Sequence, residues 1–207
     1  MLFRSNEGLD IHAYVASQVF EVPIEDVTSD QRRVAKTVNF GIIYGQTAFG
    51  LARTLRIPQG EAAKFIAAYK ERYTGLDRFL RACIAEAEDV GHVTTIMGRR
   101  RVIEEIRSRN RSLRHLGERL AINTVIQGSA ADLIKVAMIN LHAKLKEDPE
   151  GARLLIQVHD ELVLETPRDK AEATMATTVD LMTNALKLRV PLRVDAALGP
   201  NWLEGKN

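Results

Sequence analysis

The spacing of apolar residues sets the strongest limit on how this chain folds. Through most of its 207 residues, apolar side chains recur every three or four positions, as on one face of an α-helix. Strand-like patterns are confined to three short stretches. These are HVTTIMGRRRVI at 92–103, RLLIQVHDELVLE at 153–165 and PLRVDAALG at 191–199. The order predicts an α+β fold, with helices first and then helices packed on a small antiparallel sheet.

Two helix starts are marked by capping residues. DIHAYVASQVF at 10–20 is expected to form the first helix, with Asp10 as its N-cap. Thr28 and Gln31 have the spacing of a capping box, in which each side chain accepts a hydrogen bond from the other residue's backbone. The next helix is therefore expected to begin near Thr28.

Proline and glycine mark further ends. Pro58 and Gly75 are expected to break residues 46–75 into short helices, and a helix over about 76–90 to end near Gly91.

The second half of the chain has fewer interruptions. A small hairpin is expected to turn at Gly98, and a long helix to run from Ser108 to about Glu147 with a break or kink near Gly128. Another helix is expected over 170–187.

Positive charge is concentrated in one region. The whole chain carries a formal charge of only +2, yet residues 99–119 hold eight arginines and three acids. Such a stretch indicates a surface for an anionic partner, and the arginine guanidinium suits phosphate in particular. A solvated, arginine-rich surface is the alternative.

The stretch RRVAKTVNFGIIYG at 32–45 has an unusual polar and aromatic pattern. Arg32, Lys36, Phe40 and Tyr44 are each four residues apart, so they follow one face of a helix. The two cations lie toward the N-terminal half, where the helix dipole also favours an anion. Together they could hold a polyphosphate, with Phe40 packing on a sugar or base. An amphipathic helix with basic residues is the alternative.

Two glycines lie within the same stretch. Gly41 and Gly45 are expected to leave room for a flat group to approach the backbone. The cost in helix stability indicates a packing or functional reason for them.

Two further clusters carry chemical groups. Asp160 and Glu161 follow His159 between two predicted strands, where a carboxylate could bind Mg²⁺ together with phosphate oxygens. Arg119, Asn123 and Gln127 share one helix face, and these side-chain types bind phosphates, sugars and base edges. Neither pattern is specific by itself.

Several features bear on the compartment. No apolar run approaches the roughly 20 residues of a membrane span, and MLFRSNEGLD lacks the apolar core of a secretory signal. Cys83 is the only cysteine, which excludes an internal disulfide or a thiolate metal cluster. We expect a cytoplasmic protein with no membrane partner, in which Cys83 is a small buried apolar group.

Taken together, these segments resemble the family A DNA polymerases, and among them the bacterial DNA polymerase I group. The stretch at 32–45 is similar to that family's fingers signature, R-R-x-x-K-x-x-x-F-G-x-x-Y-G. The matching residues are Arg32, Arg33, Lys36, Phe40, Gly41, Tyr44 and Gly45. VHDE at 158–161 resembles the palm carboxylate motif. DIHAYVASQVF, MGRRR, ERLAINTVIQGSAADLIK and NWLE are also similar, in the family's order.

The resemblance implies a nucleotide site on the 32–45 helix. Arg32, Lys36 and His12 would bind the incoming dNTP's triphosphate, with Lys36 in a catalytic role. Phe40 would pack on the sugar and discriminate against dideoxynucleotides. Tyr44 would stack at the template end of the nascent pair and move with the helix.

The resemblance also implies a metal and DNA site. Asp160 would bind catalytic Mg²⁺, with two ions in the complete site and Mn²⁺ as a substitute, and Glu161 would support it. His159 would lie near the primer terminus. Primer–template DNA would be contacted by Arg33, Arg119, Asn123 and Gln127.

Some parts of the family pattern are missing. Residues 1–110 would form most of the fingers and 111–207 the C-terminal part of the palm. The thumb and an upstream segment resembling D-Y-S-Q-I-E-L-R, which carries the other catalytic aspartate, are absent from this sequence. The chain alone is therefore expected to be inactive until the missing segment is supplied. The alternatives are a non-catalytic module that binds primer–template and an unstable truncation with no function.

Overall fold

The computed structural model describes residues 10–206, and the chain divides into two compact units, Met1–Ser129 and Ala130–Asn207. The helix α7 (Arg111–Leu145) has residues in both. The boundary expected near residue 110 concerns functional subdomains and stays a prediction.

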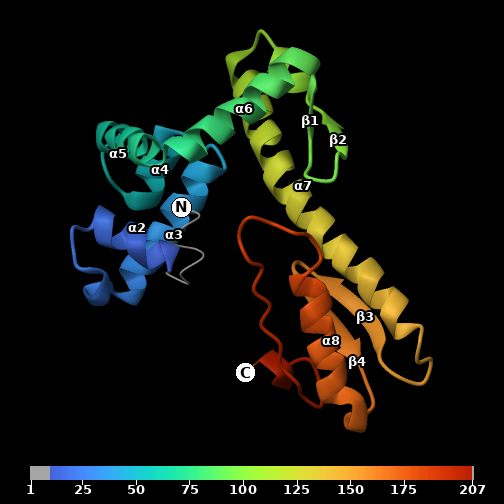
Figure 1. Ribbon diagram of the computed structural model, residues 1–207. Helices are drawn as coiled ribbons and strands as arrows, with labels where there is room; N and C mark the ends of the chain where they lie inside the picture. Colours follow the sequence, from blue (N-terminus) through green and yellow to red (C-terminus); the bar gives the residue numbers. More distant parts are fainter. Residues whose placement is uncertain (1–9, 207) are drawn as a thin grey trace. The chain divides into compact units, whose positions relative to one another are not determined.

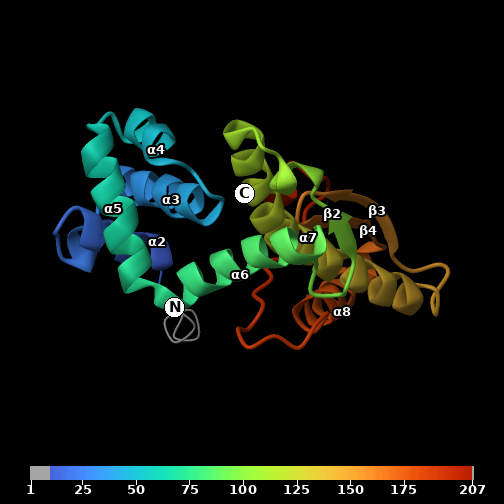
Figure 2. The same cartoon turned by 90° about the horizontal axis from the view of Figure 1, so that it is seen from above.

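The first unit consists mainly of helices. They are α2 (Ile11–Val19), η1 (Ile24–Asp26), α3 (Ser29–Ile43), α4 (Ala48–Leu55), α5 (Gln59–Arg72) and α6 (Thr74–Val90). Figures 1 and 2 both show α2 to α5 grouped together, with α6 leading from them to a hairpin of β1 (His92–Thr94) and β2 (Arg100–Val102). The turn η2 (Glu104–Arg107) then precedes α7.

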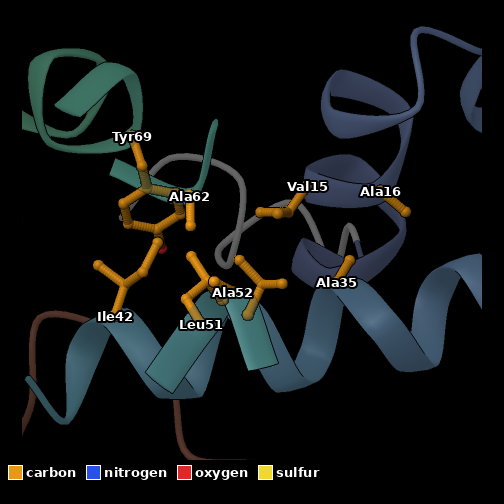
Figure 3. Close-up of a cluster of buried hydrophobic side chains, with 9 residues drawn as sticks. Val15, Ala16, Ala35, Ile42, Leu51, Ala52, Ala62 and Tyr69 are labelled. Carbon is orange, nitrogen blue, oxygen red and sulfur yellow. The ribbon is translucent and has the colours of Figure 1, made fainter. Parts of the chain in front are cut away.

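One apolar cluster joins the helices α2 to α5, as Figure 3 shows. It comprises Val15, Ala16, Ala35, Val38, Ile42, Leu51, Ala52, Ala62 and Tyr69. Small residues such as Ala16, Ala35 and Ala62 are fully buried, so these helices approach one another closely. The cluster fixes one face of α3 against the protein and leaves its opposite face exposed.

A second cluster holds the hairpin against α6 and α7. Its buried members are Ala87, Val93, Ile103, Ile106 and Ala121. The pairing of His92 with Val102 sets the hairpin register, and Gly98 has φ +76°, as a tight turn requires. The predicted turn at Gly98 is confirmed.

The second unit contains the end of α7 and a hairpin of β3 (Arg153–Val158) and β4 (Glu161–Glu165). The turn η3 (Arg168–Lys170), the helix α8 (Ala171–Thr183) and the turn η4 (Glu204–Lys206) follow. Val158 pairs with Glu161, so only His159 and Asp160 form the connection. The predicted α+β class, mostly helical with small antiparallel sheets, is confirmed.

Local signals predicted most helix ends correctly. Asp10 caps α2, Thr28 and Gln31 form the capping box of α3, Pro58 precedes α5, and Gly91 ends α6 in the left-handed conformation. Each of these signals acts within a few residues and needs no distant partner.

Two glycines predicted as breaks lie inside helices. Gly75 is in the first turn of α6, and the break falls at Tyr73 instead. Gly128 lies within the unbroken α7, where an added Cβ would come within 2.6 Å of Thr95 Cγ2. The Arg99 guanidinium also donates to the Gly128 carbonyl at 3.0 Å. Gly128 thus allows the hairpin to lie against the helix.

The strand predicted over residues 191–199 is wrong. This segment has no strand conformation, and it pairs with neither β3 nor β4 in the described part of the chain. An alternating pattern gives a strand only where a neighbouring strand supplies hydrogen-bond partners.

Candidate functional site

The N-terminal end of α3 is held by its capping box. Gln31 Oε1 accepts from the Thr28 amide at 2.9 Å, and Thr28 Oγ1 accepts from the Gln31 amide at 3.2 Å. The helix therefore begins at a fixed residue, which sets the positions of the side chains along its exposed face.

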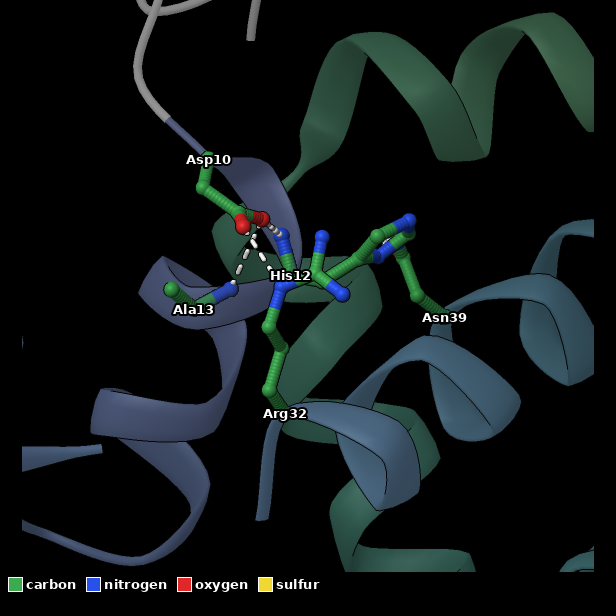
Figure 4. A network of polar contacts seen from close by, with 5 residues as sticks. All are labelled: Asp10, His12, Ala13, Arg32 and Asn39. Atoms are coloured by element: carbon green, nitrogen blue, oxygen red, sulfur yellow. Dashed lines mark hydrogen bonds and ion pairs between the residues drawn. The ribbon is translucent and has the colours of Figure 1, made fainter. Parts of the chain in front are cut away.

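Arg32 is anchored by a carboxylate from another helix. Its Nε lies 2.5 Å from Asp10 Oδ2, while Asp10 Oδ1 accepts from the amides of His12 and Ala13 at the start of α2 (Figure 4). Burial works to raise the pKa of Asp10, but these hydrogen bonds and the Arg32 charge outweigh it and lower the pKa. The carboxylate thus stays ionised and positions Arg32 beside α2.

His12 lies within the same group of side chains. Its ring centroid is 5.5 Å from that of Phe40, and its Nδ1 is 3.5 Å from Asn39 Nδ2. Burial lowers the pKa of His12; Asp10 opposes this effect, whereas Arg32 and Lys36 add to it. The imidazole is therefore neutral near pH 7.

An aromatic pair continues this face of α3. Phe40 and Tyr44 stack at 5.9 Å with an interplanar angle of 10°, and 39% of Phe40 is exposed. Arg32 and Lys36 are also exposed, whereas Ala35, Val38 and Ile42 on the opposite side are buried. The α3 face thus presents two cations and then a flat apolar surface.

The last turn of α3 opens onto a hollow of about 390 Å³. Its lining residues are Phe40, Gly41, Tyr44, Gly45, Gln46, Thr47 and Arg119. Tyr44 is the C-cap of the helix, and Gly45 has φ +76°. Arg119 Cγ would lie 3.1 Å from a Cβ at Gly45, so the glycine lets α7 approach.

One side chain lies directly beside Gly41. A Cβ there would lie 1.9 Å from Gln46 Oε1, so the space beside Gly41 is occupied by the Gln46 side chain. Gln46 in turn donates from Nε2 to Thr54 Oγ1 at 3.1 Å. The glycine accommodates this side chain at the edge of the hollow that Gly41 also lines, and the approach of a flat group stays a prediction.

The predicted DNA-binding residues of the first unit differ in their surroundings. Arg33 is largely exposed and pairs with Asp30 at 2.9 Å, on the surface of α3. Asn123 has a buried Oδ1 with no hydrogen-bond partner among the described residues, and Gln127 is exposed. Of the set, Arg119 is the one that lines the hollow beside α3.

The predicted metal residues belong to the second unit. His159 has φ +55°, a left-handed conformation that tightens the turn, and its carbonyl accepts from Gln157 Nε2. Asp160 and Glu161 follow it and are exposed. Their hard carboxylate oxygens fit Mg²⁺. Within residues 10–206, however, no three His, Cys, Asp or Glu side chains come together to hold a metal ion.

Sequence reasoning missed three residues near the exposed face of α3. Asp10 was predicted only as a helix cap, although it also holds Arg32. Asn39 was missed although it is a polar residue on the buried stripe of α3, a signal that could have identified it. No sequence pattern indicated that Gln46 would lie beside Gly41.

Comparisons with known proteins are extensive. The sequence model of DNA polymerase family A matches residues 1–204. DNA polymerase I of Bacillus caldotenax is 48% identical over 198 residues, which are 96% of this chain and 23% of that protein. DNA polymerase I of Bacillus subtilis (strain 168) is 49% identical over 198 residues, 96% of this chain and 22% of that protein.

A solved structure is similar over the whole chain. It is the POL domain of Pol1 from M. smegmatis, in complex with DNA primer-template and dNTP. The TM-score is 0.94 at 40% identity, over 100% of this chain and 36% of that one. The chain thus spans less than a quarter of the length of the two Bacillus relatives. No helix of residues 10–206 has the length and apolar character needed to cross a bilayer.

Proposed function

This chain belongs to DNA polymerase family A, and on that premise we propose that it carries the dNTP site and one metal-binding carboxylate of a template-directed DNA polymerase. The exposed face of α3 is the observation that carries the proposal. It places Arg32, Lys36 and Phe40 in a line, with His12 against the Phe40 ring. A dNTP is an anion joined to a sugar and a flat base, which is the same sequence of chemical groups.

The reaction is the transfer of a nucleotide to a primer. The primer 3′-hydroxyl releases its proton to water as its oxygen attacks the α-phosphorus of the dNTP, a phosphodiester bond forms, and pyrophosphate leaves with the electrons of the broken P–O bond. Such reactions depend mainly on positioning and charge stabilisation. Arg32 and Lys36 would stabilise the triphosphate charge, and His12 would donate a hydrogen bond to it.

The aromatic residues would order the rest of the nucleotide. Phe40 would pack on the sugar, and Tyr44 would stack at the template end of the new pair. Rotation of α3 would then bring the triphosphate-binding residues into place over a correctly shaped pair, as an induced-fit step.

A divalent cation is implied by the family. Asp160 would be one ligand, with Glu161 supporting it, and their exposed carboxylates fit Mg²⁺ or Mn²⁺. Two such ions would stabilise the attacking and leaving oxygens. Because residues 10–206 supply no group of three ligating side chains, we propose that another segment of the polymerase completes the site.

Primer–template DNA is the proposed partner. Arg119, Asn123 and Gln127 would contact the minor groove, where correct pairs share acceptors at N3 and O2. Arg33 would contact the DNA backbone, and His159 would lie near the primer terminus. The fingers would correspond to residues 1–110 and the C-terminal palm to 111–207.

A chimaeric enzyme tests the proposal. This chain would replace the matching region of the Bacillus subtilis DNA polymerase I, to which it is 49% identical. We expect primer extension with dNTPs and Mg²⁺ by the chimaera and none by the chain alone. We expect Lys36→Ala to raise the dNTP KM and Asp160→Ala to abolish extension. Lys64→Ala, at an exposed position of α5, is the matched control.

Three outcomes would contradict parts of the proposal. Extension by the chain alone would show that it contains a complete metal site. An inactive but folded chimaera that binds primer–template in a salt-dependent manner would favour the non-catalytic binding module. Equal dNTP kinetics for Lys36→Ala and Lys64→Ala would contradict the assignment of the nucleotide site to α3.

A further inference from the structure

Asn39 connects His12 to the core of the first unit. It lies on the buried face of α3, where only 3% of it is exposed. Its amide meets two side chains from other helices: Tyr69 on α5 donates from Oη to Oδ1, and Nδ2 faces His12 Nδ1 on α2 at 3.5 Å. Figure 3 shows Tyr69 among the buried side chains, and Figure 4 shows Asn39 beside the His12 ring.

The Tyr69 hydroxyl determines which way the amide points. Burial, and secondly the neighbouring Tyr73, raise the pKa of Tyr69, so the phenol keeps its proton. A buried O–H needs an acceptor, and the hydrogen bonds of the described residues give it Asn39 Oδ1. Reversing the amide would remove that acceptor. Oδ1 therefore faces Tyr69, and Nδ2 must face His12.

The amide orientation in turn determines the histidine tautomer. An N–H donor facing Nδ1 requires an unprotonated Nδ1, so the single proton of neutral imidazole is on Nε2. We propose that Asn39 and Tyr69 are positioning residues that hold His12 as the neutral Nε2–H tautomer, with its one N–H available to the anion bound by Arg32 and Lys36. The identity of that anion as a nucleotide triphosphate rests on the proposed function, whereas the tautomer does not.

The surrounding charges agree with a neutral ring. Asp10 on α2 favours the imidazolium, whereas burial and the α3 cations Arg32 and Lys36 disfavour it. Protonation at Nδ1 would also place two donors face to face unless the Asn39 amide reversed and broke its bond with Tyr69. His12 thus contributes a directed hydrogen bond, and the positive charge of the site comes from Arg32 and Lys36.

The tautomer can be observed directly. The whole chain, with ¹⁵N-labelled histidine, would be examined by two-bond ¹H–¹⁵N correlation above pH 7, and His12→Gln would assign the signal. We expect the Nε2–H pattern for His12. A predominant Nδ1–H pattern would overturn the proposal without requiring any further variant.

Two tyrosine variants test the connection. Tyr69→Phe removes the hydroxyl that orients the amide, so we expect His12 to become a mixture of tautomers. Tyr14→Phe is the matched control on α2, because the Tyr14 hydroxyl accepts from Arg72 at 2.6 Å. It should leave the tautomer unchanged. An unaltered Nε2–H pattern in folded Tyr69→Phe would refute the role of Tyr69.

A separate measurement addresses the anion. Inorganic tripolyphosphate should shift the His12 Nε2 signal, and in the chimaera Tyr69→Phe should raise the dNTP KM about three- to tenfold, the value of one neutral hydrogen bond, with kcat less affected. If the Nε2–H tautomer is present but tripolyphosphate shifts nothing, the phosphate role of His12 fails and the tautomer assignment stands. If tripolyphosphate shifts the His12 signal but the ring is the Nδ1–H tautomer, the phosphate role of His12 stands and the tautomer assignment fails.

Discussion

The Asp10 carboxylate accepts hydrogen bonds from the start of α2 through one oxygen and binds the Arg32 side chain of α3 through the other. The distances are 2.9 Å to the His12 amide, 3.1 Å to the Ala13 amide and 2.5 Å to Arg32 Nε. One side chain therefore both caps a helix and positions a cation on the exposed face of α3. Its two roles can be separated by substitution.

Asp10→Asn should retain the cap and lose the negative charge. We expect a free energy of unfolding within about 0.5 kcal/mol of wild type, whereas Asp10→Ala should lose about 1 kcal/mol because the cap is removed. The ion pair itself adds little, since both side chains are more than 40% exposed. Urea denaturation measures both variants.

The same variant should affect anion binding. Asp10→Asn removes the carboxylate that competes for Arg32, so we expect tighter binding of tripolyphosphate at low salt, measured by calorimetry. Asp30→Asn is the control, because it removes the partner of Arg33 outside this group of residues. An equal effect of both variants would indicate a general charge effect.

Phe40→Tyr should weaken discrimination against dideoxynucleotides. Phe40 is 39% exposed, and a hydroxyl added to its ring could replace the hydrogen bond that the missing 3′-hydroxyl no longer makes. Competition between ddNTP and dNTP in the chimaera measures the change. Phe49→Tyr, on the exposed surface of α4, should have no effect. No difference between the two would argue against Phe40 as the sugar contact.

Two helical glycines should respond oppositely to alanine. A Cβ at Gly60 meets nothing within 4 Å, so Gly60→Ala should stabilise the chain by about 0.5 kcal/mol. A Cβ at Gly117 would lie 2.6 Å from the Ile106 backbone nitrogen, so Gly117→Ala should cost about 2 kcal/mol. Thermal and urea unfolding would test both. Destabilisation by Gly60→Ala would contradict the open surroundings.

Cys83 should be unreactive in the folded chain. Burial, with a smaller contribution from Glu86, raises the pKa of the thiol to about 11. We expect slow reaction with a disulfide reagent at pH 8 and fast reaction in urea, because the thiolate is the reactive form. Rapid labelling of the native protein would contradict this burial.

The same pKa gives a pH dependence. The ordinary pKa of the thiol is 9.0, so between there and about pH 11 the unfolded state binds fewer protons than the folded state. Stability should therefore fall as the pH rises through this range. Cys83→Ala should remove this part of the fall in unfolding free energy with pH. If the pH dependence is unchanged in Cys83→Ala, other groups cause it.

Contacts between distant residues account for most of what sequence patterns missed. Arg32 was predicted as a phosphate ligand, and nothing near it in the sequence identified Asp10, 22 positions away, as a contact of its side chain. Asn39 and Tyr69 are 30 positions apart. Gly128 was predicted as a helix break because glycine disfavours helices. The prediction failed because the reason for the glycine, its contact with Thr95, comes from a distant part of the sequence.

The sequence by itself determined the capping box at Thr28 and Gln31, the turns at Gly98 and His159, and the order of residues along the face of α3. These depend on backbone conformations and hydrogen bonds within a few residues, so short patterns contain the necessary information. Tertiary structure alone decided the Asp10–Arg32 pair, the Tyr69–Asn39–His12 connection and the absence of a strand at 191–199 among the described residues. Such contacts form only when packing brings separate elements together, and packing depends on the whole core.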